Sequence, residues 1–166
     1  MIFNALTNTP PKDVSQFPAT LWVLYANMYI SLFAVWGVFY YLHLQNTLPD
    51  FSQLPLNILA IVLPVLGIAT TIGAHFISQK RLQVAAAQTS LGSKVRHYSS
   101  IFMLRKAGWF STNMSGAIMY YFTKDLRYAV FLVICMVAYV VYRPSKDRLR
   151  TELQLTEQEM YELYEA

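Results

Sequence analysis

Two long runs without a charged side chain constrain this sequence more than any other feature. The first, FPATLWVLYANMYISLFAVWGVFYYLHL, occupies residues 17–44, and the second, LPLNILAIVLPVLGIATTIGAHFIS, occupies residues 54–78. Each exceeds the roughly 20 residues that cross about 30 Å of hydrocarbon. A chain of 166 residues is too short to surround two such runs with a soluble core. The sequence therefore predicts an all-α integral membrane protein.

The charge balance fits the same class. Charged residues make up only 13% of the chain, with 13 Lys and Arg against 9 Asp and Glu. The positive side chains flank the apolar runs and do not alternate with aromatic residues, so we expect no nucleic-acid partner. The single cysteine, Cys135, lies within an apolar run and excludes an intramolecular disulfide. The expected surroundings are the lipid bilayer and other membrane helices.

Two further segments are candidate spans. The segment 126–143 has 15 uncharged residues between Arg127 and Arg143, which can reach outward to the headgroups. The segment 105–127, RKAGWFSTNMSGAIMYYFTKDLR, has 17 uncharged residues between Lys106 and Lys124. It is weakly apolar and becomes longer only if Arg105 and Lys106 also reach the headgroups. Local sequence leaves open whether it crosses the membrane.

The distribution of positive charge favours four spans. With four spans, 11 of the 13 Lys and Arg residues lie on the cytoplasmic side, and Lys124 and Arg127 lie outside. With three, the basic segments 79–127 and 144–166 would face opposite sides. We therefore predict a single transmembrane domain over residues 1–166, with both termini cytoplasmic and a charged tail over 144–166. The expected spans cover about 18–42, 55–78, 101–123 and 126–143.

The stretch 79–100 between the second and third spans is rich in helix-forming residues. We expect both spans to continue into the cytoplasm as a helical hairpin that turns near Thr89–Ser93, with Gly92 as a helix stop and Ser93 as a cap. A helix lying along the membrane surface is the alternative.

The tail carries its own signals. Pro144 is expected to follow the end of the fourth span. TEQE at 156–159 has the form of a capping box and predicts a short helix that ends near Tyr164. Four glutamates near the tip could form a docking peg for a basic partner, although a solvated helix is the favoured interpretation: Glu157, Glu159, Glu162 and Glu165.

Small residues recur at a spacing of four in the second and third spans. This spacing places them on one helix face, where they allow close packing between helices in lipid. The predicted helix-packing residues are Gly67, Thr71, Gly73, Gly108, Thr112 and Gly116. Pro64 cannot donate a hydrogen bond within its helix, so we expect a neighbour to meet the carbonyl that it leaves free.

Polar residues within the spans allow a second interpretation. They could line a hydrophilic path between helices, although hydrogen bonds between helices are their commoner use. The candidates for such a path are Asn27, Ser31, Ser111 and Asn113.

The sequence lacks the patterns of several functional classes. All nine carboxylates fall outside the span cores, which disfavours a proton- or cation-coupled carrier acting alone. We find no nucleophile–base–acid set, phosphate-binding loop or H-E-x-x-H motif, so we expect no enzyme activity. His43, His75 and His97 share no metal-type spacing, and we expect no metal or cofactor.

Residues 94–163 resemble an uncharacterised family of small four-span bacterial membrane proteins of the kind found in Bacteroidetes. The matching elements are Lys94, Tyr98, Arg105, YYFT at 120–123 and YRPSKDRLRTELQL at 142–155. The sequence departs from the pattern at Phe110–Ser111, where an acidic–glycine step is expected. The resemblance implies a location in the bacterial inner membrane and four spans, and it implies no activity.

These observations lead to three hypotheses of function. The first is a non-enzymatic membrane protein that acts by helix–helix association, as a homo-oligomer or as an accessory subunit of a larger complex. The second is a small channel or transporter that uses the polar path. The third and least favoured is a haem-binding redox subunit.

Overall fold

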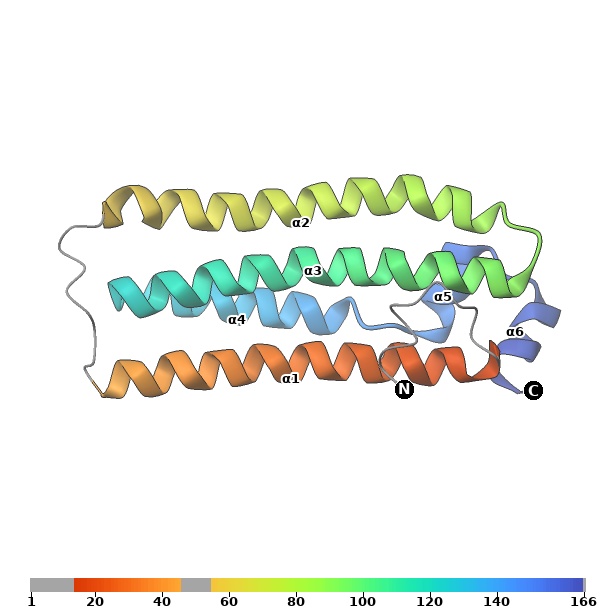
Figure 1. Ribbon diagram of the computed structural model, residues 1–166, viewed down its shortest axis with the longest axis horizontal. Helices are drawn as coiled ribbons and strands as arrows, with labels where there is room; N and C mark the ends of the chain where they lie inside the picture. The colour runs from red at the N-terminus through yellow and green to blue at the C-terminus, as the bar shows by residue number, and fades with distance from the viewer. Residues whose placement is uncertain (1–13, 46–54, 166) are drawn as a thin grey trace. The chain divides into compact units, whose positions relative to one another are not determined.

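The computed structural model describes residues 14–45 and 55–165, and the regular elements in these two ranges are all helices (Figure 1). The expected outer loop falls largely on residues 46–54, outside the described ranges. The elements are η2 (Val14–Gln16), α1 (Phe17–Leu44), α2 (Leu56–Ala86), α3 (Leu91–Thr123), α4 (Leu126–Val141), α5 (Lys146–Leu153) and α6 (Glu157–Tyr164). The all-helical prediction is confirmed for this part of the chain.

Two helices are long and apolar enough to cross a membrane. They cover Val14–Leu42 and Leu56–Ala86, and the number rises to three if α4 and α5 count as one bent span. α4 alone has 16 residues, and α3, although it has 33, carries charged residues along its first half. The helices therefore have the lengths and composition of a membrane protein.

The break between α2 and α3 is a short turn. It covers residues 87–90, and Gly92 and Ser93 already belong to α3. The hydroxyl of Ser90 accepts a hydrogen bond from the backbone N–H of Ser93, at 3.3 Å. Ser90 therefore caps α3, in place of the expected Ser93, because the helix starts one turn earlier than the glycine suggested.

The chain packs as two compact units. Unit 1 comprises the described residues of 1–26, 75–105 and 144–166, and unit 2 comprises those of 27–74 and 106–143. The three long helices contribute to both, whereas α4 belongs to unit 2, and α5 and α6 belong to unit 1.

Within unit 2, α3 contacts the other three helices. Its Thr112 hydroxyl lies 2.7 Å from that of Thr71 on α2, and Gly116 faces Phe131 on α4. On the α1 side, the rings of Trp36 and Tyr120 stack with their centroids 6.0 Å apart. α3 is thus the central helix of this unit.

Two glycines bring the backbones of α2 and α3 together. A Cβ added at Gly67 would lie 2.9 Å from the Cα of Thr112, and one added at Gly108 would lie 3.0 Å from the Cα of Thr71. Such distances leave no room for a side chain. Nothing lies within 4 Å of a Cβ added at Gly73. The α2–α3 seam therefore has two matched stripes, and Gly73 is not part of it: Gly67, Thr71 and Ala74 on α2, and Gly108, Thr112 and Ser115 on α3.

The polar side chains of α3 face protein. Thr112, Asn113 and Ser115 are all buried, with Asn113 only 1% exposed. The Thr112 hydroxyl also lies 2.6 Å from the carbonyl oxygen of Gly67, a hydrogen bond across the seam. A hydroxyl that bonds a neighbouring helix does not have to be exposed to lipid, where it would be unsatisfied.

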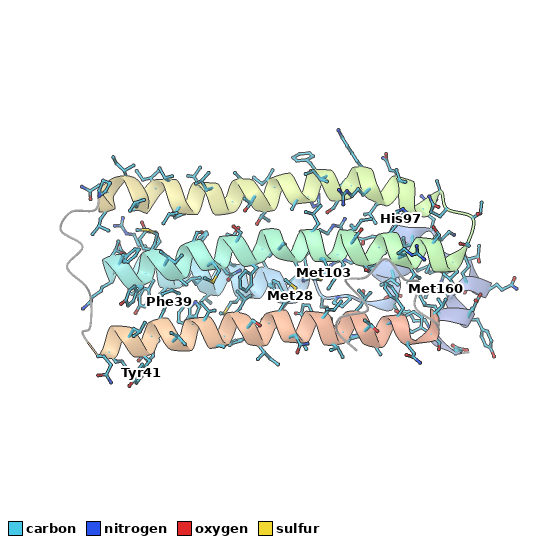
Figure 2. The ribbon with its side chains drawn as sticks, in the orientation of Figure 1. Met28, Phe39, Tyr41, His97, Met103 and Met160 are labelled. Carbon is cyan, nitrogen blue, oxygen red and sulfur yellow. The ribbon has the colours of Figure 1, made fainter. Side chains whose placement is uncertain are left out.

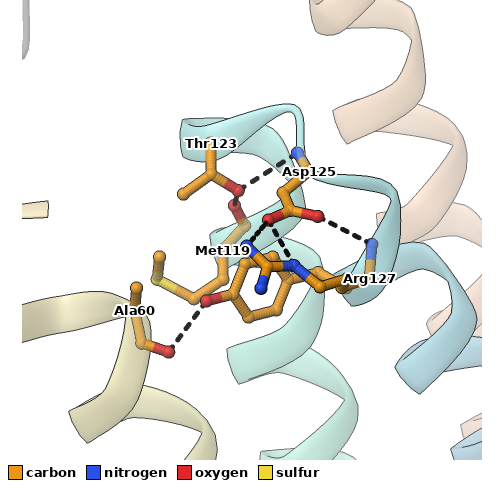
Figure 3. Close-up of polar contacts among 6 residues, drawn as sticks. Ala60, Met119, Thr123, Asp125 and Arg127 are labelled. Atoms are coloured by element: carbon orange, nitrogen blue, oxygen red, sulfur yellow. Dashed lines mark hydrogen bonds and ion pairs between the residues drawn. The ribbon is translucent and has the colours of Figure 1, made fainter. Parts of the chain in front are cut away.

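The turn between α3 and α4 is tight and well capped (Figure 3). Lys124 adopts a positive φ of 55°, and the Asp125 carboxylate accepts a hydrogen bond from the backbone N–H of Arg127 as the N-cap of α4. Hydrogen bonds from the Arg127 guanidinium, and then from this backbone N–H, hold the pKa of Asp125 below its ordinary value. The helix ends fall where the expected bounds at 123 and 126 placed them, so the short junction within TKDLR is confirmed.

The carbonyl left free by Pro64 has a partner. Pro64 lies inside α2, and the residue four positions earlier, Ala60, loses its usual helical donor. The Tyr128 hydroxyl of α4 donates to the Ala60 oxygen at 2.9 Å, a bond drawn in Figure 3. This confirms the prediction that a neighbouring helix satisfies this carbonyl.

The seam gives a matched pair of substitutions. Gly67→Ala should lower the stability of the purified protein by about 1–3 kcal/mol, because the added methyl forces the backbones apart. Gly73→Ala should leave stability unchanged or slightly higher, because the position is open and alanine favours helix. Thermal unfolding in mild detergent, followed by tryptophan fluorescence, checks both. Equal melting temperatures for the two variants would contradict the seam.

Candidate functional site

The tail forms two helices because its sequence caps both of them. The Ser145 hydroxyl accepts from the backbone N–H of Arg148 at the start of α5. The side chains and backbones of Thr156 and Glu159 form the predicted capping box of α6. Gln154 ends α5 in the left-handed conformation, with φ 49°, and allows the chain to turn between the helices.

The apolar side chains of the tail are buried. They recur at helical spacing and form the core of unit 1 together with residues of α3, while α6 also contacts η2. One side of α6 is therefore packed against its unit, while Glu157, Glu162 and Glu165 on the rest of the tip are exposed, as expected for a solvated helix. The buried tail residues are Leu149, Leu153, Leu155, Met160, which is labelled in Figure 2, and Leu163.

The α3 surface that faces the tail combines apolar and basic residues. Lys94, Tyr98, Ile101 and Arg105 follow one another at spacings of four, three and four, which places them on one helix face. Tyr98 and Ile101 are 2% and 1% exposed. This face, together with the buried side of α5 and α6, is termed the tail dock.

Two ion pairs hold the tail dock. The Lys94 ammonium lies 2.7 Å from the Glu159 carboxylate of α6, and the Arg105 guanidinium lies 2.7 Å from the Glu152 carboxylate of α5. All four side chains are less than one-fifth exposed. Such partly buried pairs resist screening by salt better than exposed ones do, and losing one partner leaves the other charge poorly solvated.

Two further acidic side chains near the tip lie close to basic groups of the tail. Glu157 pairs with Arg150, and Glu165 lies 3.9 Å from Lys146. These residues border an open hollow of about 570 Å³ between α5 and α6, whose charged groups already pair with one another. The acidic tip is therefore largely neutralised within its own unit, unlike the docking peg considered from sequence.

The tail dock perturbs two titratable groups. Burial raises the pKa of Tyr98, and the nearby negative charge of Glu152 raises it further. For Glu159, burial alone would raise the pKa, but hydrogen bonds from the Lys94 ammonium and the Thr156 backbone N–H bring it below its ordinary value. The ionised form of Glu159 is therefore the form that stabilises the docked tail.

Lys106 occupies a second, separate polar site, in unit 2. Its side chain is buried, its ammonium donates to the Tyr142 carbonyl at 3.0 Å, and it lies 3.8 Å from the centroid of the Tyr139 ring. Tyr142 is the C-cap of α4, where carbonyl groups lack helical partners. A longer third span would require Arg105 and Lys106 to reach the headgroups, but in the structure both have partners in the protein, Lys106 as a cap for α4.

The four residues of the possible polar path do not form one lining. Asn27 and Ser31 are exposed on α1, where the Ser31 hydroxyl donates to the Asn27 carbonyl at 2.8 Å. Asn113 is buried, and its amide donates to the Trp109 carbonyl of its own helix. Ser111 lies two residues away, about 200° around α3 from Asn113. Their positions favour local hydrogen bonding over a shared path.

The described histidines are dispersed. His75 and His97 are both exposed, and the Nδ1 atom of His97 lies 2.9 Å from the Ser93 carbonyl oxygen of its own helix. Within residues 14–45 and 55–165, no group of three or more His, Cys, Asp or Glu side chains is placed to hold a metal ion.

Sequence reasoning missed α5 and the tail dock. The signals for α5 were present: Ser145 after Pro144 is a typical N-cap, and Leu149 and Leu153 are four apart. Nothing in the local sequence specified that Lys94 and Arg105 meet glutamates about 50 residues or more further along the chain.

Comparisons with protein-family models, curated proteins and solved structures give no match to this chain. The resemblance of residues 94–163 to a four-span family stays a prediction.

The first prediction for the site concerns pH. Because the folded-state pKa of Glu159 is lowered, its contribution is fully present above its ordinary pKa of 4.5 and is lost as pH falls through the lowered value. A dye on Glu162→Cys in a Cys135→Ser background should lose anisotropy over that acidic range as α6 becomes mobile. Lys94→Met should lower the anisotropy at neutral pH and abolish its further loss at acidic pH. An identical acid step in both proteins would contradict the role of the pair.

The second concerns the cap of α4. Lys106→Met removes the hydrogen bond to the Tyr142 carbonyl and should destabilise the last turn of α4 by about 1–3 kcal/mol. Hydrogen exchange at the backbone amides of Tyr142 and Arg143 should then accelerate about tenfold. Lys124→Met, at an exposed lysine in the α3–α4 turn, is the control and should leave these two amides unchanged.

Proposed function

We propose that this protein is a non-enzymatic, four-span protein of the bacterial inner membrane that acts by associating with other membrane helices, as a homo-oligomer or as an accessory subunit. In this proposal the α2–α3 turn and the tail dock lie in the cytoplasm, together with both termini. The two helices of spanning length and the positive charge near the α2–α3 turn support it.

The packing of α3 supports its assignment as a span. Its weakly apolar composition argues against crossing alone, but Thr112, Asn113 and Ser115 are buried by protein in unit 2 and Ser111 is half-buried. A helix inserted beside α2 and α4 would expose few of these groups to lipid. The seam also uses small residues of α2 and α3 within one chain, so these residues are not available to a partner.

The observation that carries the proposed association is on α1. Asn27 and Ser31 are exposed and four residues apart, on a helix whose neighbouring exposed side chains, Ile30 and Phe33, are apolar. An amide side chain facing hydrocarbon is unfavourable, whereas a second helix can satisfy it by hydrogen bonding. Ala34 continues the stripe and allows close approach. The α1 face of Asn27, Ser31 and Ala34 is therefore the proposed association face.

The oligomeric mass in mild detergent tests this face. The wild type should run as a homo-oligomer, or with a co-purifying subunit, because Asn27 can bond across helices. Asn27→Leu with Ser31→Leu should weaken association about five- to thirtyfold, as expected for losing about 1–2 kcal/mol.

Thr70→Leu is the matched control, because Thr70 is an exposed polar residue on α2 and lies outside the proposed face. It should leave the mass unchanged. A wild-type protein that is monomeric at native expression level and brings no partner would contradict the proposed function.

A further inference from the structure

The positive charges of the segment 75–105 divide into a paired group and an exposed group. It contains five Lys and Arg residues and no Asp or Glu. Lys94 and Arg105 face the tail dock and pair with glutamates. The other three, Lys80, Arg81 and Arg96, are exposed. The tail therefore pairs with two of these five cations and leaves three exposed.

The exposed cations lie at matching heights on two helices. Arg81 stands five residues before the end of α2 at Ala86, and Arg96 stands five residues after the start of α3 at Leu91. At 1.5 Å per residue, each lies about 7–8 Å from the connecting turn. Lys80 and His97, which is exposed and labelled in Figure 2, lie one residue further from the turn. The exposed basic residues of the two helices thus lie at similar distances from the turn, and this position is termed the basic level.

This level directly follows the uncharged part of α2. No charged residue occurs in α2 before Lys80, and Phe76 and Ile77, one turn earlier, are exposed apolar side chains. In a membrane, such side chains contact lipid tails, and the next turn reaches the headgroups. Lys80 and Arg81 are therefore placed at the depth of lipid phosphates.

We propose that Lys80, Arg81 and Arg96 form a binding surface for the headgroups of anionic phospholipids. Arginine forms paired hydrogen bonds with phosphate oxygens, and lysine adds a compact positive charge. Each cation close to an anionic lipid surface contributes about fivefold in affinity, so three contribute about 100-fold at low salt. The inference rests on the proposed function only in that α2 crosses the membrane; it does not require association through α1.

Lipid retention by the purified full chain tests the surface. The protein is mixed in mild detergent with phosphatidylglycerol or phosphatidylcholine, and bound lipid is counted by native mass spectrometry. The wild type should retain phosphatidylglycerol preferentially, and the preference should fall with added salt. In the triple variant Lys80→Gln, Arg81→Gln, Arg96→Gln, the preference for phosphatidylglycerol should fall by about 100-fold if all three cations contribute fully.

A matched triple variant controls for net charge. Arg127→Gln, Lys146→Gln, Arg150→Gln removes the same number of cations, but from side chains that lie beside Asp125, Glu165 and Glu157. It should keep the preference for phosphatidylglycerol. Equal losses in the two triple variants, or equal retention of both lipids by the wild type, would overturn the proposal. Displacement of the lipid by millimolar inorganic phosphate would also overturn it, since the surface would then be a site for a free anion.

The Asn27→Leu, Ser31→Leu variant separates this proposal from the proposed function. The lipid preference should persist in that variant whatever its oligomeric mass, because the α1 face contributes none of the three cations. Loss of the preference in that variant would contradict the lipid surface.

Discussion

The need to shelter the polar face of α3 governs the packing of unit 2. Hydroxyl and amide groups that are removed from water require hydrogen-bond partners. Close approach of α2, made possible by Gly67 and Gly108, brings the Thr71 and Thr112 hydroxyls together and supplies the Gly67 carbonyl as an acceptor. Asn113, next to Thr112, is buried as well, and its amide donates to the Trp109 carbonyl of its own helix. A helix that is poorly suited to lipid on its own becomes the central helix of its unit.

Two adjacent basic residues show how α3 secures the last third of the chain. Arg105 pairs with Glu152 of α5, and Lys106 donates to the carbonyl at the end of α4. Successive residues point about 100° apart on a helix, so each side chain reaches a different element. Arg105 therefore holds α5 within unit 1, and Lys106 caps α4 within unit 2. The tail then contributes a buried apolar side, so its charges act as orienting contacts around a packed core.

Much of the helical framework could be predicted because its signals are local. The uncharged runs predicted α1 and the apolar part of α2. The charged TKDLR segment predicted the junction of α3 and α4, and the capping box predicted α6. The partner for the carbonyl freed by Pro64 was expected, although its identity as Tyr128 was not. The tail dock could not be predicted, because ion pairs such as that of Lys94 with Glu159 join residues far apart in sequence. Glycine spacing was similarly incomplete, since it marks a small face without showing whether a helix lies against it, as Gly73 demonstrates.

By itself, the sequence determined that the chain is helical and suited to a membrane, because the length and charge of a segment decide whether lipid can surround it. It also indicated several helix ends, such as the start of α6 at the capping box, since caps and prolines act over a few residues. Only the tertiary structure decided what the charged and polar side chains do. It buried Lys106, neutralised the acidic tip and left Lys80, Arg81 and Arg96 exposed. The physical reason is that the free energy of a polar group depends on its partners, and packing between distant segments selects those partners.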